Sequence, residues 1–147
     1  MPHSFTKNHI HLIFGTKERR KMIPPQMVPR VWEYIAGICR NHRIFPVTVG
    51  GMRDHAHVLI DLPASIALSE AVVLIKANSS KWLNEEGVDF NWQEGYGAFA
   101  VSVSNVPAVI RYIQNQERHH RKTSFKDEYR AFLIKHGVEF DERFFAE

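Results

Sequence analysis

Cysteine is nearly absent from this chain of 147 residues, which contains only Cys39. A single cysteine excludes an internal disulfide and a zinc site built from cysteines alone, and it is typical of a reducing compartment. Long apolar runs are also missing. Residues 1–20 hold none of signal-peptide length, and no stretch reaches the ~20 apolar residues that a membrane-spanning helix needs. We therefore expect a soluble, cytoplasmic protein.

Strong charge is lacking as well, because 19 Lys and Arg stand against 16 Asp and Glu, for a formal net charge of +3. This small excess favours an anionic partner such as nucleic acid, but it is not the excess of a histone-like protein. Hydrophobic residues make up 44% of the chain, which is enough at this length for one substantial core. We therefore expect one domain over residues 1–147.

Apolar periodicity predicts alternating strands and helices. The predicted strands are 9–14, 44–49, 55–62 and 97–103, with Gly50 and Gly51 as the turn between the second and third. The predicted helices are 25–41, 66–84, 104–121 and 124–136. The order β-α-β-β-α-β followed by two helices predicts an α+β, ferredoxin-like (split βαβ, RRM-like) fold. Its antiparallel sheet carries helices on one face, plus the two C-terminal helices.

Histidine is frequent, with nine residues, several of them in close pairs. His55 and His57 stand two positions apart on a predicted strand, so both imidazoles project from the same face. Two imidazoles on one face can share a metal ion, although a hydrogen-bonded pair on a half-buried sheet has the same pattern. His9 and His11 repeat this spacing on another strand, where we expect structural or incidental roles, the alternative being a contact of one of them with the metal region or the DNA.

Tyr112 and Gln116 lie four positions apart, which places a phenol and an amide on one face of the predicted helix. The amide oxygen of Gln116 is a candidate third ligand. Three neutral ligands leave positions open for phosphate oxygens and water, which suits Mg²⁺ or Mn²⁺. A tyrosine hydroxyl beside such an ion can attack phosphorus, forming a phosphotyrosine and releasing a 3′-hydroxyl. Because that linkage conserves the bond energy, and no GxxxxGK[ST] loop is present, no nucleotide cofactor is expected.

The histidine pair and the Tyr-Ile-x-x-Gln run occur in order with HLIFGTK at 11–17, GYGAFAVS at 95–102 and QERHH at 116–120. Together they resemble the single-tyrosine HUH transposases of the IS200/IS605 type and their REP-associated relatives. The resemblance extends over nearly the whole chain. It implies that His55, His57 and Gln116 bind Mg²⁺ or Mn²⁺, and that Tyr112 is the catalytic nucleophile.

The resemblance also implies a homodimer that cuts and rejoins single-stranded DNA beside hairpins through a 5′-phosphotyrosine. Such a protein is expected in the cytoplasm, associated with the nucleoid. In this family the helix that bears the nucleophile can serve the partner's metal site. We therefore expect Tyr112 and Gln116 to dock across the dimer rather than fold back on their own chain.

Two groups of basic residues are candidate DNA-phosphate contacts or simply solvated surface. They are Lys17, Arg19, Arg20 and Lys21 near the start, and Arg118, His119, His120, Arg121 and Lys122 after the tyrosine. The three tryptophans, Trp32, Trp82 and Trp92, are expected in the core or an interface.

Two other functions stay open at this point. One is a non-catalytic, RRM-like module that binds single-stranded nucleic acid on its sheet. The other is a zinc hydrolase in which His11 joins His55 and His57. Tight zinc binding would favour the hydrolase, whereas weak Mg²⁺ or Mn²⁺ binding would favour the transposase.

Overall fold

In the computed structural model, which describes residues 4–145, four strands form one antiparallel sheet. They are β1 (His9–Gly15), β2 (Phe45–Met52), β3 (His55–Asp61) and β4 (Gly97–Val101). The order across the sheet is β2-β3-β1-β4, so β1 and β3 are the central strands. This is the split βαβ order, and it confirms the predicted fold class.

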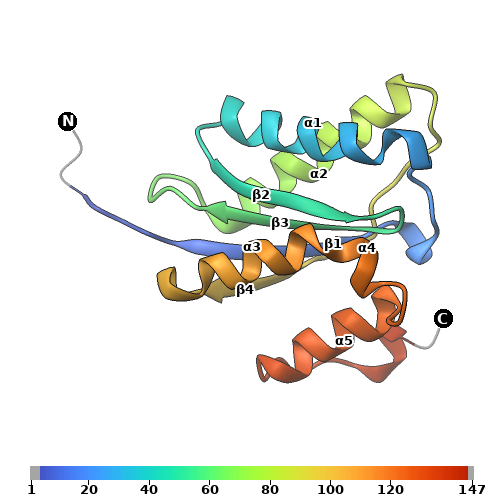
Figure 1. Ribbon diagram of the computed structural model, residues 1–147. Coiled ribbons are helices and arrows are strands. Elements are labelled where there is room, and N and C mark those ends of the chain that lie inside the picture. The colour runs from blue at the N-terminus through green and yellow to red at the C-terminus, as the bar shows by residue number, and fades with distance from the viewer. Residues whose placement is uncertain (1–3, 146–147) are drawn as a thin grey trace.

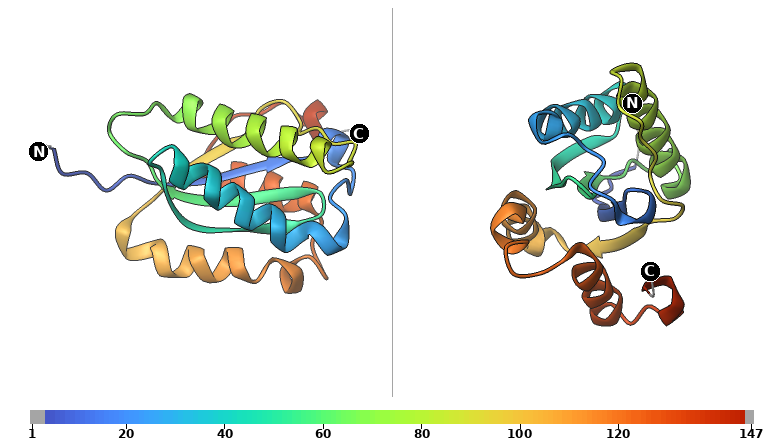
Figure 2. Two further views of the ribbon diagram at one scale, coloured as in Figure 1. Left: turned by 90° about the horizontal axis from the view of Figure 1, so that it is seen from above. Right: turned by 90° about the vertical axis from the view of Figure 1, so that its right-hand side faces the viewer.

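Helices cover both faces of the sheet (Figures 1 and 2). One face carries α1 (Val28–Asn41) and α2 (Leu68–Glu85), and the other carries α3 (Val106–Gln114), α4 (Gln116–His119) and α5 (Phe125–Lys135). Short 3₁₀ turns η1 to η4 lie at Lys17–Arg19, Pro25–Met27, Val103–Asn105 and Glu142–Phe145. The second helical layer leaves the sheet without the open face on which an RRM-like module stacks bases, which argues against that alternative.

The alternation of side chains along β3 places its apolar residues and its two histidines on opposite faces of the sheet. Ala56, Val58 and Ile60 are fully buried in the core between the sheet and the helices α1 and α2. His55 and His57, also fully buried, therefore point toward α3, α4 and α5. The predicted common face of the two histidines is thus confirmed.

Gly50 and Gly51 are not the turn between β2 and β3, as the sequence predicted, but lie within β2. The pairing continues through them, with Gly50 opposite His57 and Gly51 opposite Ala56, so the chain turns at residues 53–54. Gly51 has a φ of +142°, and a Cβ there would lie 2.3 Å from the carbonyl oxygen of His55. A Cβ on Gly50 would lie 2.7 Å from the carbonyl oxygen of Ile113. Glycine is therefore needed here so that α3 can approach the sheet.

The predicted helix over 104–121 is broken at Asn115, which has φ −106° and ψ 23°. Its N–H bonds to the carbonyl oxygen of Tyr112, three residues back, and α4 begins at the next residue. Pro107 lies in the first turn of α3 as expected, but the side chain of Asn105 does not cap the helix. Tyr112 and Gln116 consequently belong to two short helices rather than one.

The remaining elements agree with the prediction to within a few residues. Ser124 caps α5 by accepting a hydrogen bond from the N–H of Asp127 at 3.1 Å. Trp32, Trp82 and Trp92 pack against the core beneath α1 and α2, which confirms the expectation for the tryptophans. Among residues 4–145, no helix is both long and apolar enough to cross a membrane.

Candidate metal centre and nucleophile

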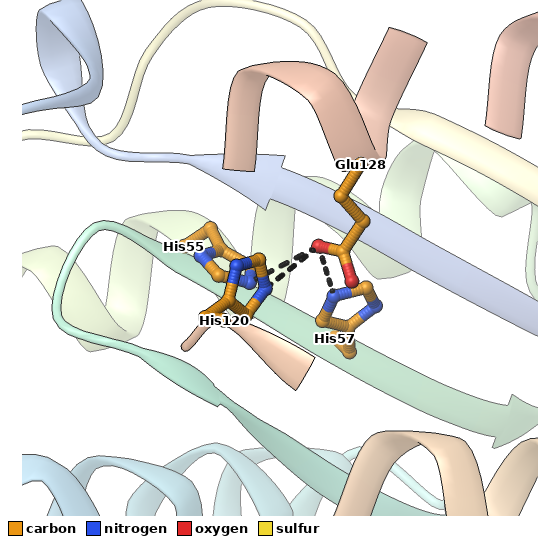
Figure 3. A group of neighbouring side chains, drawn as sticks. All are labelled: His55, His57, His120 and Glu128. Carbon is orange, nitrogen blue, oxygen red and sulfur yellow. Dashed lines mark hydrogen bonds and ion pairs between the residues drawn. The ribbon is translucent and has the colours of Figure 1, made fainter. Parts of the chain in front are cut away.

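Three histidines direct one ring nitrogen each toward a common point. His55 and His57 come from β3, and His120 comes from the end of α4 (Figure 3). Together with the Glu128 carboxylate from α5 they form the His/Glu cluster, in which the four ligand atoms lie within 4.8 Å of one another. Elements distant in sequence thus build this cluster on the face of the sheet that α3 to α5 cover.

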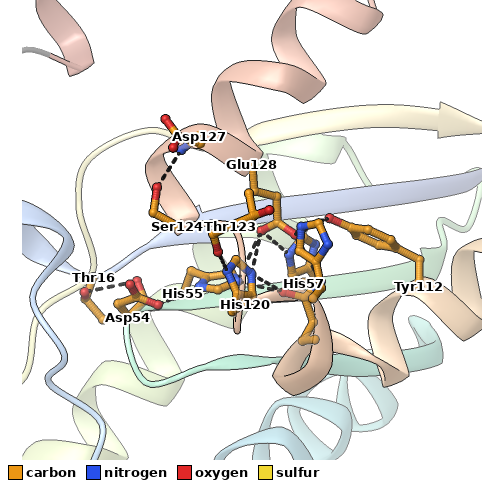
Figure 4. Close-up of polar contacts among 12 residues, drawn as sticks. Thr16, Asp54, His55, His57, Tyr112, His120, Thr123, Ser124, Asp127 and Glu128 are labelled. Atoms are coloured by element: carbon orange, nitrogen blue, oxygen red, sulfur yellow. Dashed lines mark hydrogen bonds and ion pairs between the residues drawn. The ribbon is translucent and has the colours of Figure 1, made fainter.

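The outer nitrogens of these rings are held by other groups (Figure 4). Nδ1 of His55 is 2.7 Å from Oδ1 of Asp54, and Nδ1 of His120 is 2.6 Å from the carbonyl oxygen of Thr123. Because these oxygens accept, both Nδ1 atoms carry protons, which leaves Nε2 of each neutral ring as a metal ligand. Such outer hydrogen bonds are the usual support of metal-binding histidines.

The inner nitrogens face oxygens rather than hydrogen-bond donors. Nε2 of His55 and of His120 lie 2.9 and 2.8 Å from Oε1 of Gln116. Nε2 of His57 lies 3.0 Å from Oε1 of Glu128. Lone pairs on nitrogen and oxygen can converge in this way only around protons or a cation. The donor set of imidazole, amide and carboxylate therefore fits a divalent metal ion.

Glu128 makes hydrogen bonds with both the candidate metal ligands and Tyr112. Its Oε1 faces His57 and, at 3.2 Å, Nε2 of His120. Its Oε2 accepts a hydrogen bond from Nε2 of Gln116 at 3.0 Å and another from the hydroxyl of Tyr112. One carboxylate thus connects the candidate metal ligands to the predicted nucleophile.

The charges in the cluster are strongly coupled. Burial lowers the pKa of His55, but hydrogen bonds with Asp54 and Glu128 outweigh it and raise the pKa to about 9. For His57 burial prevails and lowers the pKa to about 4, despite the nearby Glu128. Burial acts to raise the pKa of Glu128, yet hydrogen bonds from His120, His55 and His57 hold it well below its usual range. The cluster therefore contains a carboxylate whose charge neighbouring imidazoles or a metal ion must balance.

Tyr112 lies on α3 with its hydroxyl at the edge of this cluster. Its ring is half-buried and meets the ring of His57 edge-on, with 5.7 Å between centroids. Burial and the negative charge of Glu128 raise the pKa of the phenol, which favours its protonated form. The hydroxyl is therefore a hydrogen-bond donor as the structure stands.

The structure brings all four predicted site residues together, with His55, His57 and Gln116 around one point and Tyr112 beside it. It does so within one chain. We expected α3 to dock across a dimer, but Gly50 lets it pack on its own sheet, so the Tyr112 hydroxyl faces its own chain's cluster.

Two further site residues, His120 and Glu128, were not among the predicted ligands. His120 follows Gln116 by four positions, the same spacing that links Gln116 to Tyr112. Its basic neighbours nevertheless predict a surface residue or a DNA contact. The structure buries most of its side chain in the cluster. Glu128 gives a fainter signal, because it stands three positions after Phe125 and four before Phe132, on the apolar face of the predicted helix.

His11 lies behind the cluster rather than in it. Its Nε2 is 2.8 Å from Nδ1 of His57, the nitrogen that points away from Glu128. His11 thus supports His57, in the way that Asp54 supports His55, and this does not match the third zinc ligand of the hydrolase alternative. His9 lies at the start of β1, opposite Asp61 in the register with β3, and outside the cluster.

The predicted basic contacts differ in their surroundings. Arg118, Arg121 and Lys122 are exposed beside the site, and His119 lies 3.4 Å from the Tyr112 hydroxyl. In the other group, Lys17 and Arg20 are exposed, and Arg20 pairs with Glu18 at 2.7 Å. Arg19 donates to the carbonyl oxygen of Phe144 at 3.3 Å, and Lys21 borders a cavity that reaches His120.

Comparison with known proteins gives a consistent result. A family model described as "Transposase IS200 like" matches residues 4–116. A candidate transposase from Deinococcus radiodurans R1 shares 20% identity over 79% of this chain and 95% of its own, with a TM-score of 0.61. A REP-associated tyrosine transposase bound to a REP hairpin shares 15% identity over 82% of this chain and 73% of its own, also with a TM-score of 0.61. No curated protein matched the sequence.

At these identities the two structures show that the fold is shared, whereas the family model adds a sequence match. That match spans most of the chain and includes His55, His57, Tyr112 and Gln116, but it ends before His120 and Glu128. By this match, the chain belongs to the family of IS200-like transposases.

Proposed function

We propose that this transposase cleaves and rejoins single-stranded DNA through a 5′-phosphotyrosine on Tyr112, with the help of a divalent metal ion. The observation that supports this proposal is the meeting of two groups on one carboxylate. Glu128 bonds the Tyr112 hydroxyl through Oε2, and it faces the imidazoles through Oε1. Nucleophile and metal ligands are thus adjacent in the same chain.

The proposed metal ligands are His55, His57 and Gln116, joined by His120 and Glu128. An ion held there polarises the scissile phosphodiester and neutralises the charge that develops on it. We propose Mg²⁺ or Mn²⁺, and the imidazole-rich donor set favours Mn²⁺, because Mg²⁺ prefers oxygen ligands. Asp54 and the carbonyl oxygen of Thr123 hold the Nδ1 protons of His55 and His120, and so keep the Nε2 atoms aimed inward.

In the proposed cleavage, the Tyr112 oxygen forms a bond to phosphorus as the bond from phosphorus to the 3′ oxygen breaks. The phenol gives up its proton as this bond forms and the departing 3′ oxygen takes one up to become a hydroxyl, so protons balance over the step. Glu128, to which the hydroxyl donates, orients the phenol. In rejoining, a 3′-hydroxyl attacks the phosphotyrosine and the bond to Tyr112 breaks. No external energy source is needed, because one phosphoester replaces another.

The proposed substrate is single-stranded DNA that carries a hairpin. The solved relative bound to a REP hairpin supports this choice, as do the exposed cations Arg118 and Lys122, which line a cavity together with Tyr112. We propose that the enzyme acts at DNA in the cytoplasm as a homodimer. Since each chain holds a complete cluster, such a dimer would contain two separate sites.

The test is the formation of a covalent adduct. End-labelled, hairpin-bearing single strands from the DNA flanking the gene are mixed with the protein and Mn²⁺, and adducts are resolved under denaturing conditions. Tyr112→Phe should abolish the adduct without unfolding the protein. Tyr34→Phe, which removes a hydroxyl from α1 on the opposite face, should leave it unchanged. An undiminished adduct in the Tyr112→Phe protein would refute the assignment.

A further inference from the structure

Two cavities of different chemistry meet at Tyr112. One, of about 550 Å³, lies between α3 and α5 and has Ala108, Val109 and Phe132 in its walls. The other, of about 340 Å³, lies beside α4 and has Arg118 and Lys122 in its walls. His119 and Thr123 border both cavities, so the two adjoin on either side of the tyrosine.

The larger cavity is apolar in its walls and acidic at one end. Ala108 on α3 and Ala131 on α5 are small, which leaves space between the two helices. The ring of Phe132 forms part of the wall and lies 5.6 Å from the Tyr112 ring, centroid to centroid. Asp127 and Glu128 also line this cavity, and their negative charge disfavours a phosphate there. The cations of the smaller cavity instead suit a phosphate.

We propose that the cavity between α3 and α5 binds a nucleobase of the strand that is cut, next to the scissile phosphate. This inference rests on the proposed function. A phosphate attacked by Tyr112 has a nucleoside on each side, so the strand must continue into the space on both sides of the tyrosine. The basic cavity receives the sugar–phosphate backbone, and the apolar one receives the base.

The cavity has the features of a base-binding site. Its volume exceeds that of a nucleobase, and Phe132 supplies an aromatic surface against which a base can pack. Asp127 accepts hydrogen bonds from amino groups, whereas Asn105 and Lys135 donate to ring nitrogens and carbonyl oxygens. Phosphate contacts fix the position of a strand and base contacts specify sequence, so this cavity is the place where the sequence at the cleavage site is read.

Photochemical cross-linking tests the proposal. Tyr112→Phe protein, which leaves the strand intact, is mixed with the hairpin-bearing strands, each carrying 5-iodouracil at one position near the cleavage site. After irradiation, mass spectrometry locates the linked peptide. We expect one position to link to the peptide that contains Phe132.

Variants that fill the cavity sharpen the test. Ala131→Trp on α5 and, independently, Ala108→Trp on α3 should each lower this cross-link at least about tenfold, given the usual contribution of base–aromatic packing. Ile134→Trp is the matched control, because Ile134 is 57% exposed on α5 and does not line the cavity. Circular dichroism confirms that each variant folds.

The outcomes separate this proposal from the function on which it rests. Wild-type protein that forms the adduct, together with cross-links that avoid Phe132 or are insensitive to both cavity-filling variants, would overturn the base site alone. Cross-links to Phe132 in a protein whose wild type forms no adduct would support the base site and refute the tyrosine chemistry.

Discussion

The hydroxyl of Tyr112 donates a hydrogen bond to Glu128, although the two residues lie on different helices, 16 positions apart in the chain. The same carboxylate accepts from Gln116 and faces the imidazole of His57. Any change at Glu128 must therefore affect both the proposed nucleophile and the proposed metal ligands.

Replacing Glu128 by Gln should weaken metal binding. The substitution keeps the size of the side chain but removes a negative charge that lies within 3.4 Å of four imidazole nitrogens. We expect the affinity for Mn²⁺, measured by calorimetry, to fall by about tenfold or more. Glu117→Gln, an exposed residue of α4, is the control and should bind as the wild type does. Equal affinities in the two variants would show that Glu128 is not a ligand.

The neighbouring residues His119 and His120 should differ sharply. His120→Ala removes a nitrogen from the His/Glu cluster and should lower the Mn²⁺ affinity by about tenfold to a hundredfold. His119→Ala removes a ring whose Nε2 lies 3.4 Å from Oε2 of Glu128, the oxygen that Tyr112 bonds, and is not one of the four converging ligand atoms, so its affinity should stay near that of the wild type. Titration of both variants, followed by Mn²⁺ electron paramagnetic resonance, gives the comparison. A larger loss in His119→Ala would contradict the assignment.

The stability of the metal-free protein should fall as the pH rises above neutrality. The pKa of His55 is raised from its ordinary value of 6.5 to about 9, so the folded protein binds this proton more tightly than the unfolded chain does. The resulting stabilisation is complete below pH 6.5 and is lost as the pH rises through 9. We expect a loss of about 3 kcal/mol in the free energy of unfolding over this range.

Urea unfolding in EDTA at pH 7, 8 and 9.5 measures this loss above the range in which the lowered pKa of His57 affects stability. Asp54→Asn removes one of the two carboxylates that stabilise the charged imidazole, so the variant should show a smaller decline. If both proteins lost the same amount, the proton on His55 would not be its source.

Gly50→Ala should disturb the site from a distance. The added Cβ would lie 2.7 Å from the backbone oxygen of Ile113 and 2.9 Å from its Cγ2, so α3 must move away from the sheet. We expect a destabilisation of about 1–3 kcal/mol by chemical unfolding, together with reduced adduct formation. Gly37→Ala on α1 is the control. Nothing lies within 4 Å of its added Cβ, and the change should be neutral or stabilising by up to about 1 kcal/mol. Similar behaviour of the two variants would refute the close approach of α3.

Mixed dimers of inactive variants should remain inactive. Tyr112→Phe lacks the nucleophile and His57→Ala lacks a metal ligand. Because both belong to one site within one chain, co-expression supplies no subunit with a complete site. Adduct formation by purified heterodimers is the measurement. Recovery toward half the wild-type yield would instead mean that the tyrosine acts in the partner's site.

Local patterns in the sequence were sufficient for the fold and for part of the site. Side chains alternate along a strand with a period of two residues, so His55 and His57 share a face wherever their strand lies in the sheet. The order of strands and helices along the chain is compatible with few sheet topologies. The predicted turn at Gly50 and Gly51 is wrong. These glycines allow the close approach of Ile113 and of the His55 backbone, and such tertiary contacts cannot be predicted from a local sequence pattern. Glu128 reaches the site through the direction in which α5 packs, and side-chain periodicity along a helix does not give that direction.

The helix break at Asn115 could not be predicted from the sequence either, since no proline or glycine stands at that position. It has a clear effect on the site, because it ends the helix that bears Tyr112 before the residues Gln116 and His120, which face the cluster. Tyr112 was correctly paired with Gln116 by spacing, yet their meeting depends on Glu128, to which both donate.

The end of the family match at residue 116 does not coincide with the end of the working site. A protein shortened to that boundary would keep His55, His57, Tyr112 and Gln116, but it would lose the ring of Phe125, which stacks on His55 with 4.2 Å between centroids. It would lose Glu128 too, and open the buried histidines to water. The candidate site is therefore incomplete without α5. A sequence that diverges in α5 while keeping the shared motif would carry a differently charged and differently shaped active site.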